Sequence, residues 1–237
     1  MQPFMLLQQL LCGVLVILVL LMHQMPCAAA PPGLTNPQEL EAFLDRFFTA
    51  RMPRLHIPSA AFVLVKDGKT FFSKNYGYAD LEKKILVDPE TLFGVGSVTK
   101  LLTATAVMQL VEQGKLSLNQ DVNKYLQQVQ VDKNYPTPVT VADLLTHTSG
   151  FDEHFIGTGA KTAAQVMPLK DYVAKQMPAR VIPPKQVICY SNYGMVLAGY
   201  LVELVSGVPF TQYVDENIFQ PLGMAHSSFM EYDQNLM

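Results

Sequence analysis

Residues 101–111 form the most apolar stretch of this 237-residue chain outside its N-terminus. Leu, Ala, Val and Met occupy most of these positions, so few polar side chains remain on any face of a helix, and Gly114 follows as a helix-ending residue. A helix that is apolar nearly all round usually lies at the centre of a large fold. Since 49% of the residues are hydrophobic, the chain can bury such a core. We therefore predict a central helix here.

Ser97 and Lys100 lie at the beginning of this predicted helix, in the segment Gly-Ser-Val-Thr-Lys. Residues three apart on a helix share a face, so the spacing places an ammonium beside a hydroxyl at the positive end of the helix dipole. A serine hydroxyl is a weak nucleophile until a neighbouring group takes its proton, and a desolvated lysine can help to do so. The alternative is a helix-capping serine followed by a surface lysine.

A second candidate site is Tyr190-Ser191-Asn192, which follows a short apolar run and precedes a predicted helix. A phenol that loses its proton beside a cation can act as a base, and an amide offers a substrate both a donor and an acceptor. The alternative is a tyrosine that packs on the core, with Asn192 as a helix cap.

Charge and residue spacing exclude several classes of function. The formal net charge of −3, without long basic runs, argues against a nucleic-acid partner, whose phosphates need a Lys/Arg surface. The five histidines form no H-E-x-x-H pair or carboxylate cluster at ligand spacing, so we predict no metal. We also predict no cofactor.

Residues 1–30 are expected to be a signal peptide or a membrane anchor. Residues 10–22 are apolar apart from one glycine and precede Ala28-Ala29-Ala30, a pattern typical of a secretory signal with its cleavage site. The stretch is short for a membrane-spanning helix, which favours the signal peptide. Residues 1–9 lack the Lys or Arg that usually begins a secretory signal, which counts against it. We expect export to the periplasm or the outside of the cell, with an uncleaved anchor through residues 10–22 and membrane association as the alternative.

The order of predicted elements indicates an α+β fold. A helix from residue 37 to about 53 precedes two strands at 60–65 and 70–78, joined by the hairpin turn Asp67-Gly68. Residues 80–93 are predicted to be a loop. These elements belong to one predicted domain, residues 31–237. The remainder of that domain is mostly helical and includes a helical subdomain at about 115–220. Its candidate helices are residues 141–145, 169–176, 195–204 and 210–218.

The two candidate sites belong to a set of four motifs that resembles a known superfamily. The motifs are FGVGSVTK at 93–100, LLTHTSG at 144–150, YSNYG at 190–194 and PLGM at 221–224. Their order and content resemble the serine β-lactamases and penicillin-binding proteins, specifically the class C β-lactamase-like branch with its esterases and D-stereospecific peptidases. The resemblance covers residues 40–229 and implies an antiparallel sheet flanked by helices, with an inserted all-α domain.

The resemblance assigns roles to the site residues. It implies that Ser97 is the nucleophile that forms an acyl-enzyme, with Lys100 as its proton-transfer partner. Tyr190 would be the base of the second motif, and Asn192 would contact Lys100 and the substrate amide. The Ser97 backbone N–H would supply half of the oxyanion hole, and His147 would belong to a structural turn. The expected substrate is a small molecule or a peptide: a β-lactam, a D-amino-acid peptide or an ester, with esterase or peptidase activity favoured over a dedicated β-lactamase.

One part of the superfamily pattern is not found in this sequence. The third motif, a Lys- or His-containing triad that ends in Gly, should follow PLGM after a long interval, and with it most of the sheet. Two strands are too few to be stable alone. We therefore expect a C-terminally truncated chain. This leaves open the alternative of a catalytically impaired, membrane-associated binding or interaction protein.

Overall fold

The computed structural model describes residues 35–153, 160 and 162–229. The chain divides into two compact units, Met1–Thr91 and Leu92–Met237. The predicted signal or anchor at 1–30 lies outside the described residues and stays a prediction, as do the boundaries of the predicted subdomain.

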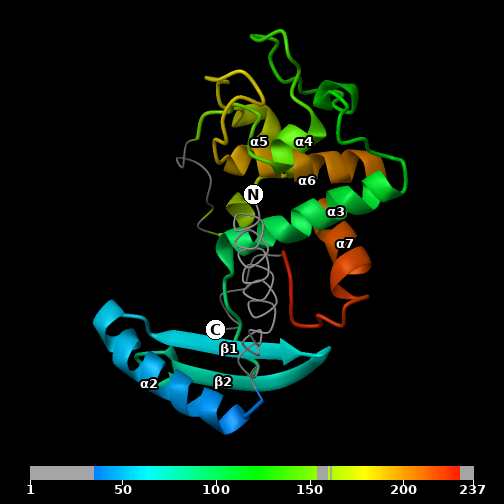
Figure 1. Ribbon diagram of the computed structural model, residues 1–237. Coiled ribbons are helices and arrows are strands. Elements are labelled where there is room, and N and C mark those ends of the chain that lie inside the picture. Colours follow the sequence, from blue (N-terminus) through cyan, green and yellow to red (C-terminus); the bar gives the residue numbers. More distant parts are fainter. Residues whose placement is uncertain (1–34, 154–159, 161, 230–237) are drawn as a thin grey trace, which may run out of the picture. The chain divides into compact units, whose positions relative to one another are not determined.

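The described part of the first unit, residues 35–91, contains one helix and a three-stranded antiparallel sheet in the order β1-β2-β3; Figure 1 labels α2, β1 and β2. Its elements are α2 (Pro37–Leu55), β1 (Ser59–Lys66), β2 (Lys69–Asp80) and β3 (Ile85–Leu86). The predicted hairpin is confirmed: Lys66 pairs with Lys69, and the turn residues Asp67 and Gly68 have φ of 51° and 72°. Positive φ at both central positions matches the twist of the strands. The short β3 strand falls within residues 80–93, which were predicted to be a loop.

Helix α2 begins where the sequence predicted, because the Asn36 side chain accepts hydrogen bonds from the first backbone N–H groups. An ionic and aromatic cluster joins α2 to β2: the Lys74 ammonium lies 2.7 Å from Glu41 and 2.8 Å from Asp45. The Tyr76 hydroxyl donates to Asp45 at 3.0 Å. Burial, and then the hydrogen bond to Asp45, raise the pKa of Tyr76 to about 12.

The named elements in the described part of the second unit are all helical, and loops join them. Its described α-helices, in chain order, are α3 (Lys100–Glu112), α4 (Val141–Leu145), α5 (Leu169–Lys175), α6 (Asn192–Ser206) and α7 (Phe210–Val214). The described residues of this unit also form three 3₁₀ turns, η1 (Gly96–Thr99), η2 (Val122–Lys124) and η3 (Ala163–Gln165), and the π-helical segment η4 (Asp215–Phe219). Helix α6 contacts α3, α4, α5 and α7 (Figure 1). The core of this unit therefore surrounds α6.

The central position of α6 corrects the prediction made for α3. Nine of the fifteen α6 residues are buried, whereas α3 buries one face only, formed by Thr103, Ala106, Val107 and Leu110. Leu101 and Met108 on α3 are 68% and 44% exposed. Composition alone does not distinguish the two helices because both are apolar nearly all round. Their neighbours decide which one is enclosed.

Among the described residues, no single helix is both long and apolar enough to cross a membrane. Helix α6 and the helical segment Phe210–Phe219 meet the length and composition criteria only as a pair bent by 82°. Since α6 is largely buried against its neighbours, its apolar character is accounted for by the core of this unit.

Candidate functional site

Ser97 and Lys100 meet at the junction of two kinds of helix. The α-helix begins at Lys100, not at Ser97 as predicted, because Gly96–Thr99 form the 3₁₀ turn η1. In a 3₁₀ turn, side chains three residues apart lie one above the other. The Lys100 Nζ atom accordingly donates to Ser97 Oγ at 3.1 Å. Gly96 has φ of 50°, a value that favours glycine, and so turns the chain into η1 immediately before the serine.

Tyr190 and Asn192 reach the same place from the beginning of α6. Ser191 caps that helix by accepting from the Gly194 N–H at 3.0 Å, so the residues on either side of it are fixed. The Tyr190 hydroxyl donates to Ser97 Oγ at 2.7 Å, and Lys100 Nζ donates to Asn192 Oδ1 at 2.7 Å. The structure therefore brings all four predicted site residues together. Their catalytic roles stay predictions.

The electrostatic environment favours loss of the Tyr190 proton. The Lys100 ammonium lies 4.9 Å from the centre of the Tyr190 ring. Lys100 and then the hydrogen bond with Ser97 hold the pKa of the Tyr190 phenol below its ordinary value. A cation close to a phenol stabilises the phenolate over the neutral form. Because Tyr190 is 46% exposed and Ser97 is also exposed, a substrate and water can reach both groups.

His147 supports this arrangement from the motif turn that follows α4. Its Nδ1 atom accepts from the Ser191 backbone N–H at 3.2 Å, and its ring lies 4.5 Å from the Tyr190 ring. Burial, and then the positive charge of Lys100, lower the pKa of His147. The neutral ring is the form that can accept at Nδ1. His147 thus contacts the backbone of the YSNYG motif. This contact agrees with the expectation that His147 belongs to a structural turn.

The turn that carries His147 is held by buried hydrogen bonds. Thr140 and Asp143 form a reciprocal capping box at the beginning of α4, and the Asp143 carboxylate also accepts from the Thr148 hydroxyl at 3.0 Å. Gly150 follows with φ of 78°, and a β-carbon there would lie 1.9 Å from the Ile182 carbonyl oxygen. Only glycine fits this position.

Glu153 belongs to the site, although sequence reasoning did not identify it. One carboxylate oxygen accepts from the Asn192 backbone N–H at 2.7 Å, and the other accepts from Asn192 Nδ2 at 2.9 Å. The two contacts direct the amide nitrogen of Asn192 to Glu153 and its oxygen to Lys100. A carboxylate at the N-terminus of α6 is also favoured by the helix dipole. Two acidic residues, Asp152 and Glu153, follow the LLTHTSG motif, but the sequence does not show which of them reaches Asn192.

No group of three or more His, Cys, Asp and Glu side chains in the described part of the chain is arranged to hold a metal ion. The functional groups that meet at the site are the Ser97 hydroxyl, the Lys100 ammonium, the Tyr190 phenol and the Asn192 amide. A serine with two proton-transfer partners in hydrogen-bond contact is suited to covalent catalysis.

Comparison with known proteins places these observations in a family. The family model described as Beta-lactamase matches residues 44–235. The protein flp of Staphylococcus aureus is 31% identical over 200 residues, which is 84% of this chain and 40% of that protein. This chain thus spans less than half the length of that relative.

Two solved structures agree with this match. The octameric penicillin-binding protein homologue from Pyrococcus abyssi aligns with a TM-score of 0.68 and 32% identity, over 78% of this chain and 43% of the other. The penicillin-binding protein from Bacillus halodurans gives a TM-score of 0.65 and 32% identity, over 78% and 56%. The predicted fold class is confirmed, whereas the class C-like branch stays a prediction. This chain belongs to the beta-lactamase family, within the superfamily of serine β-lactamases and penicillin-binding proteins.

Proposed function

We propose that this protein is a serine hydrolase that cleaves amide or ester bonds through an acyl-enzyme formed at Ser97. One observation carries the proposal: Ser97 Oγ lies within hydrogen-bond distance of both Tyr190 Oη, at 2.7 Å, and Lys100 Nζ, at 3.1 Å. A helix-capping serine needs neither contact. Membership of a family that consists largely of serine hydrolases supports the assignment.

The proposed acylation begins with Tyr190 as the phenolate, which the Lys100 ammonium stabilises. Tyr190 Oη takes the Ser97 hydroxyl proton while Ser97 Oγ attacks the substrate carbonyl carbon. The tetrahedral intermediate collapses when Tyr190 gives the proton to the leaving amine or alcohol, which leaves the acyl group on Ser97. A water molecule then attacks the ester carbonyl with Tyr190 as its base, and the acid is released with Ser97 restored.

Two further groups complete the proposed site. The Ser97 backbone N–H, at the beginning of η1, supplies one donor to the oxyanion of the intermediate. Asn192 positions Lys100 through its Oδ1 atom and meets the substrate amide.

The proposed substrates are small esters and D-amino-acid peptides, in preference to β-lactams as dedicated substrates. The branch that the four motifs resemble contains esterases and D-stereospecific peptidases. The names of two structural relatives describe penicillin-binding proteins, so a penicillin is a suitable probe for the same acylation step.

The experiment is hydrolysis of p-nitrophenyl acetate, nitrocefin and a D-alanyl-D-alanine peptide by the purified chain. Ser97→Ala should abolish turnover, and Tyr190→Phe should lower it about 100-fold to 10,000-fold, the usual contribution of a general base. Ser117→Ala is the matched control, because Ser117 is an exposed serine of the same unit. Turnover that is equal in the wild type and Ser97→Ala would refute the proposal.

A further inference from the structure

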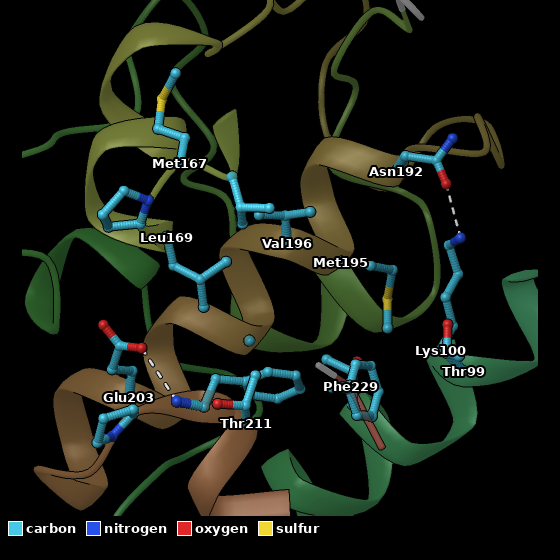
Figure 2. A pocket seen from close by; sticks show the side chains of 16 residues that line it. Thr99, Lys100, Met167, Leu169, Asn192, Met195, Val196, Glu203, Thr211 and Phe229 are labelled. Carbon is cyan, nitrogen blue, oxygen red and sulfur yellow. Dashed lines mark hydrogen bonds between the residues drawn. The ribbon is translucent and has the colours of Figure 1, made fainter. Parts of the chain in front are cut away.

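A cavity of about 630 Å³ adjoins the site along one face of α6 (Figure 2). Asn192, Met195, Val196, Gly199 and Glu203 line it at helical spacings of three and four residues, so they form one stripe. At a rise of 1.5 Å per residue, the stripe from the first to the last of them is about 16 Å long. The volume lies within the range of small-molecule sites.

The cavity is polar at the end next to the site and apolar along its walls. Lys100 and Asn192, joined by their 2.7 Å hydrogen bond, line that end. Met167, Leu169 and Phe229 also line the cavity, and in Figure 2 the Leu169 side chain points toward the α6 stripe. Methionine is flexible and polarisable, so such walls adapt to an apolar ligand.

Gly199 and Glu203 shape the interior of the cavity. At Gly199 the absence of a side chain leaves room in front of the Phe210 ring, which a β-carbon would approach to 3.5 Å. At the far end, the Glu203 carboxylate accepts from the Phe210 backbone N–H at 3.1 Å and is therefore already engaged. Between Asn192 and Glu203, the stripe is formed by Met195, Val196 and Gly199, which offer a ligand apolar contacts.

We propose that this cavity binds the apolar acyl chain of the substrate, so that the enzyme prefers esters or amides of elongated, unbranched acyl groups. This inference rests on the proposed function, because Lys100 lies both at the cavity and 3.1 Å from Ser97 Oγ. A peptide in the same place would bury backbone N–H and C=O groups against apolar walls, at a cost in free energy. A compact β-lactam would leave the far part of the cavity unfilled.

The first test is a series of p-nitrophenyl esters: acetate, butyrate, octanoate and dodecanoate. We expect kcat/KM to rise roughly fourfold for each methylene that enters the cavity. Val166→Trp, at a cavity-lining position that is 48% exposed, should lower the octanoate-to-acetate ratio at least tenfold. Leu222→Trp, at a position that is 69% exposed and does not line the cavity, should leave the ratio unchanged. An octanoate-to-acetate ratio of one or less in the wild type would overturn the proposal, as would equal ratios in the two variants.

A second measurement separates this proposal from the proposed function. Dodecanoate is titrated calorimetrically into Ser97→Ala, which cannot turn over, and into the Ser97→Ala, Val166→Trp double variant. We expect binding to the first protein and at least tenfold weaker binding to the second. Ser97-dependent ester hydrolysis without dodecanoate binding would refute the cavity proposal alone. Dodecanoate binding that Val166→Trp weakens, in a protein that hydrolyses no ester, would refute the proposed function alone.

Discussion

Replacing Glu153 with glutamine removes a negative charge from the beginning of α6 with little change in side-chain size. The carboxylate accepts two hydrogen bonds from Asn192, one from its backbone and one from its side chain. The glutamine amide has a single acceptor oxygen. If that oxygen keeps the backbone contact, the glutamine nitrogen faces Asn192 Nδ2, and two donors meet. If Asn192 rotates to avoid this, its own nitrogen faces the Lys100 ammonium.

The magnitude follows from the contact that is lost. A hydrogen bond to a charged group contributes about 1.5–3 kcal/mol. If that contact positions Lys100 during acylation, its loss slows the reaction about 10-fold to 150-fold, at about 1.4 kcal/mol per factor of ten. We expect the loss in kcat, with little change in KM, because Lys100 acts on the reacting serine.

The assay is the rate of Ser97 acylation by p-nitrophenyl acetate, followed as the release of p-nitrophenol. Asp171→Asn is the matched control, since Asp171 is an acidic residue in the first turn of α5 and outside the site. Both variants lose a favourable charge at a helix N-terminus, so both should melt at a lower temperature. Only Glu153→Gln should acylate slowly. If it acylated at the wild-type rate, Glu153 would be a helix cap without a role in positioning Lys100.

Three further predictions concern stability. Gly150→Ala should destabilise the protein by more than Gly114→Ala, as measured by chemical denaturation. Both substitutions add about 1–2 kcal/mol of strain at a left-handed backbone position, but only the β-carbon at residue 150 meets a carbonyl oxygen. The pKa of His147 is lowered in the folded state, so the unfolded state binds more protons and the free energy of unfolding should rise with pH up to about 6.5. Melting temperature followed against pH should show this rise, and His147→Asn should weaken it. Asp132→Ala should lower the free energy of unfolding by about 3–5 kcal/mol, because it removes the carboxylate that pairs with the buried Arg180 guanidinium. The Asp132→Ala, Arg180→Met double variant should regain part of this stability, and a double variant as unstable as Asp132→Ala would contradict the prediction.

The features that the sequence predicted correctly are those that depend on neighbouring residues. The Asp67-Gly68 hairpin follows from turn chemistry, and helix α4 begins and ends at the predicted residues because Thr140 and Asp143 form a local capping box. The contact between Ser97 and Lys100 follows from their spacing of three, although the turn between them is 3₁₀. Each is decided within a few residues of the chain.

The features that the sequence did not reveal depend on distant contacts. Glu153 lies 39 positions before Asn192, outside any helix or strand, and no strong sequence signal marks it. The burial of α6, in place of α3, depends on which helices surround each of them. The meeting of Tyr190 with Ser97, 93 positions apart, was anticipated only because the motifs resemble a known superfamily.

Whether Ser97 is a nucleophile can be decided by mass spectrometry of the purified chain after incubation with benzylpenicillin or a fluorophosphonate, in parallel with Ser97→Ala. We expect an added mass on the peptide that contains Ser97, and none on that peptide in the variant. Without an adduct on protein shown to be folded by circular dichroism, or with equal labelling of the variant, Ser97 would not be a nucleophile in this chain. The protein would then be better described as a binding or interaction protein that has the family fold.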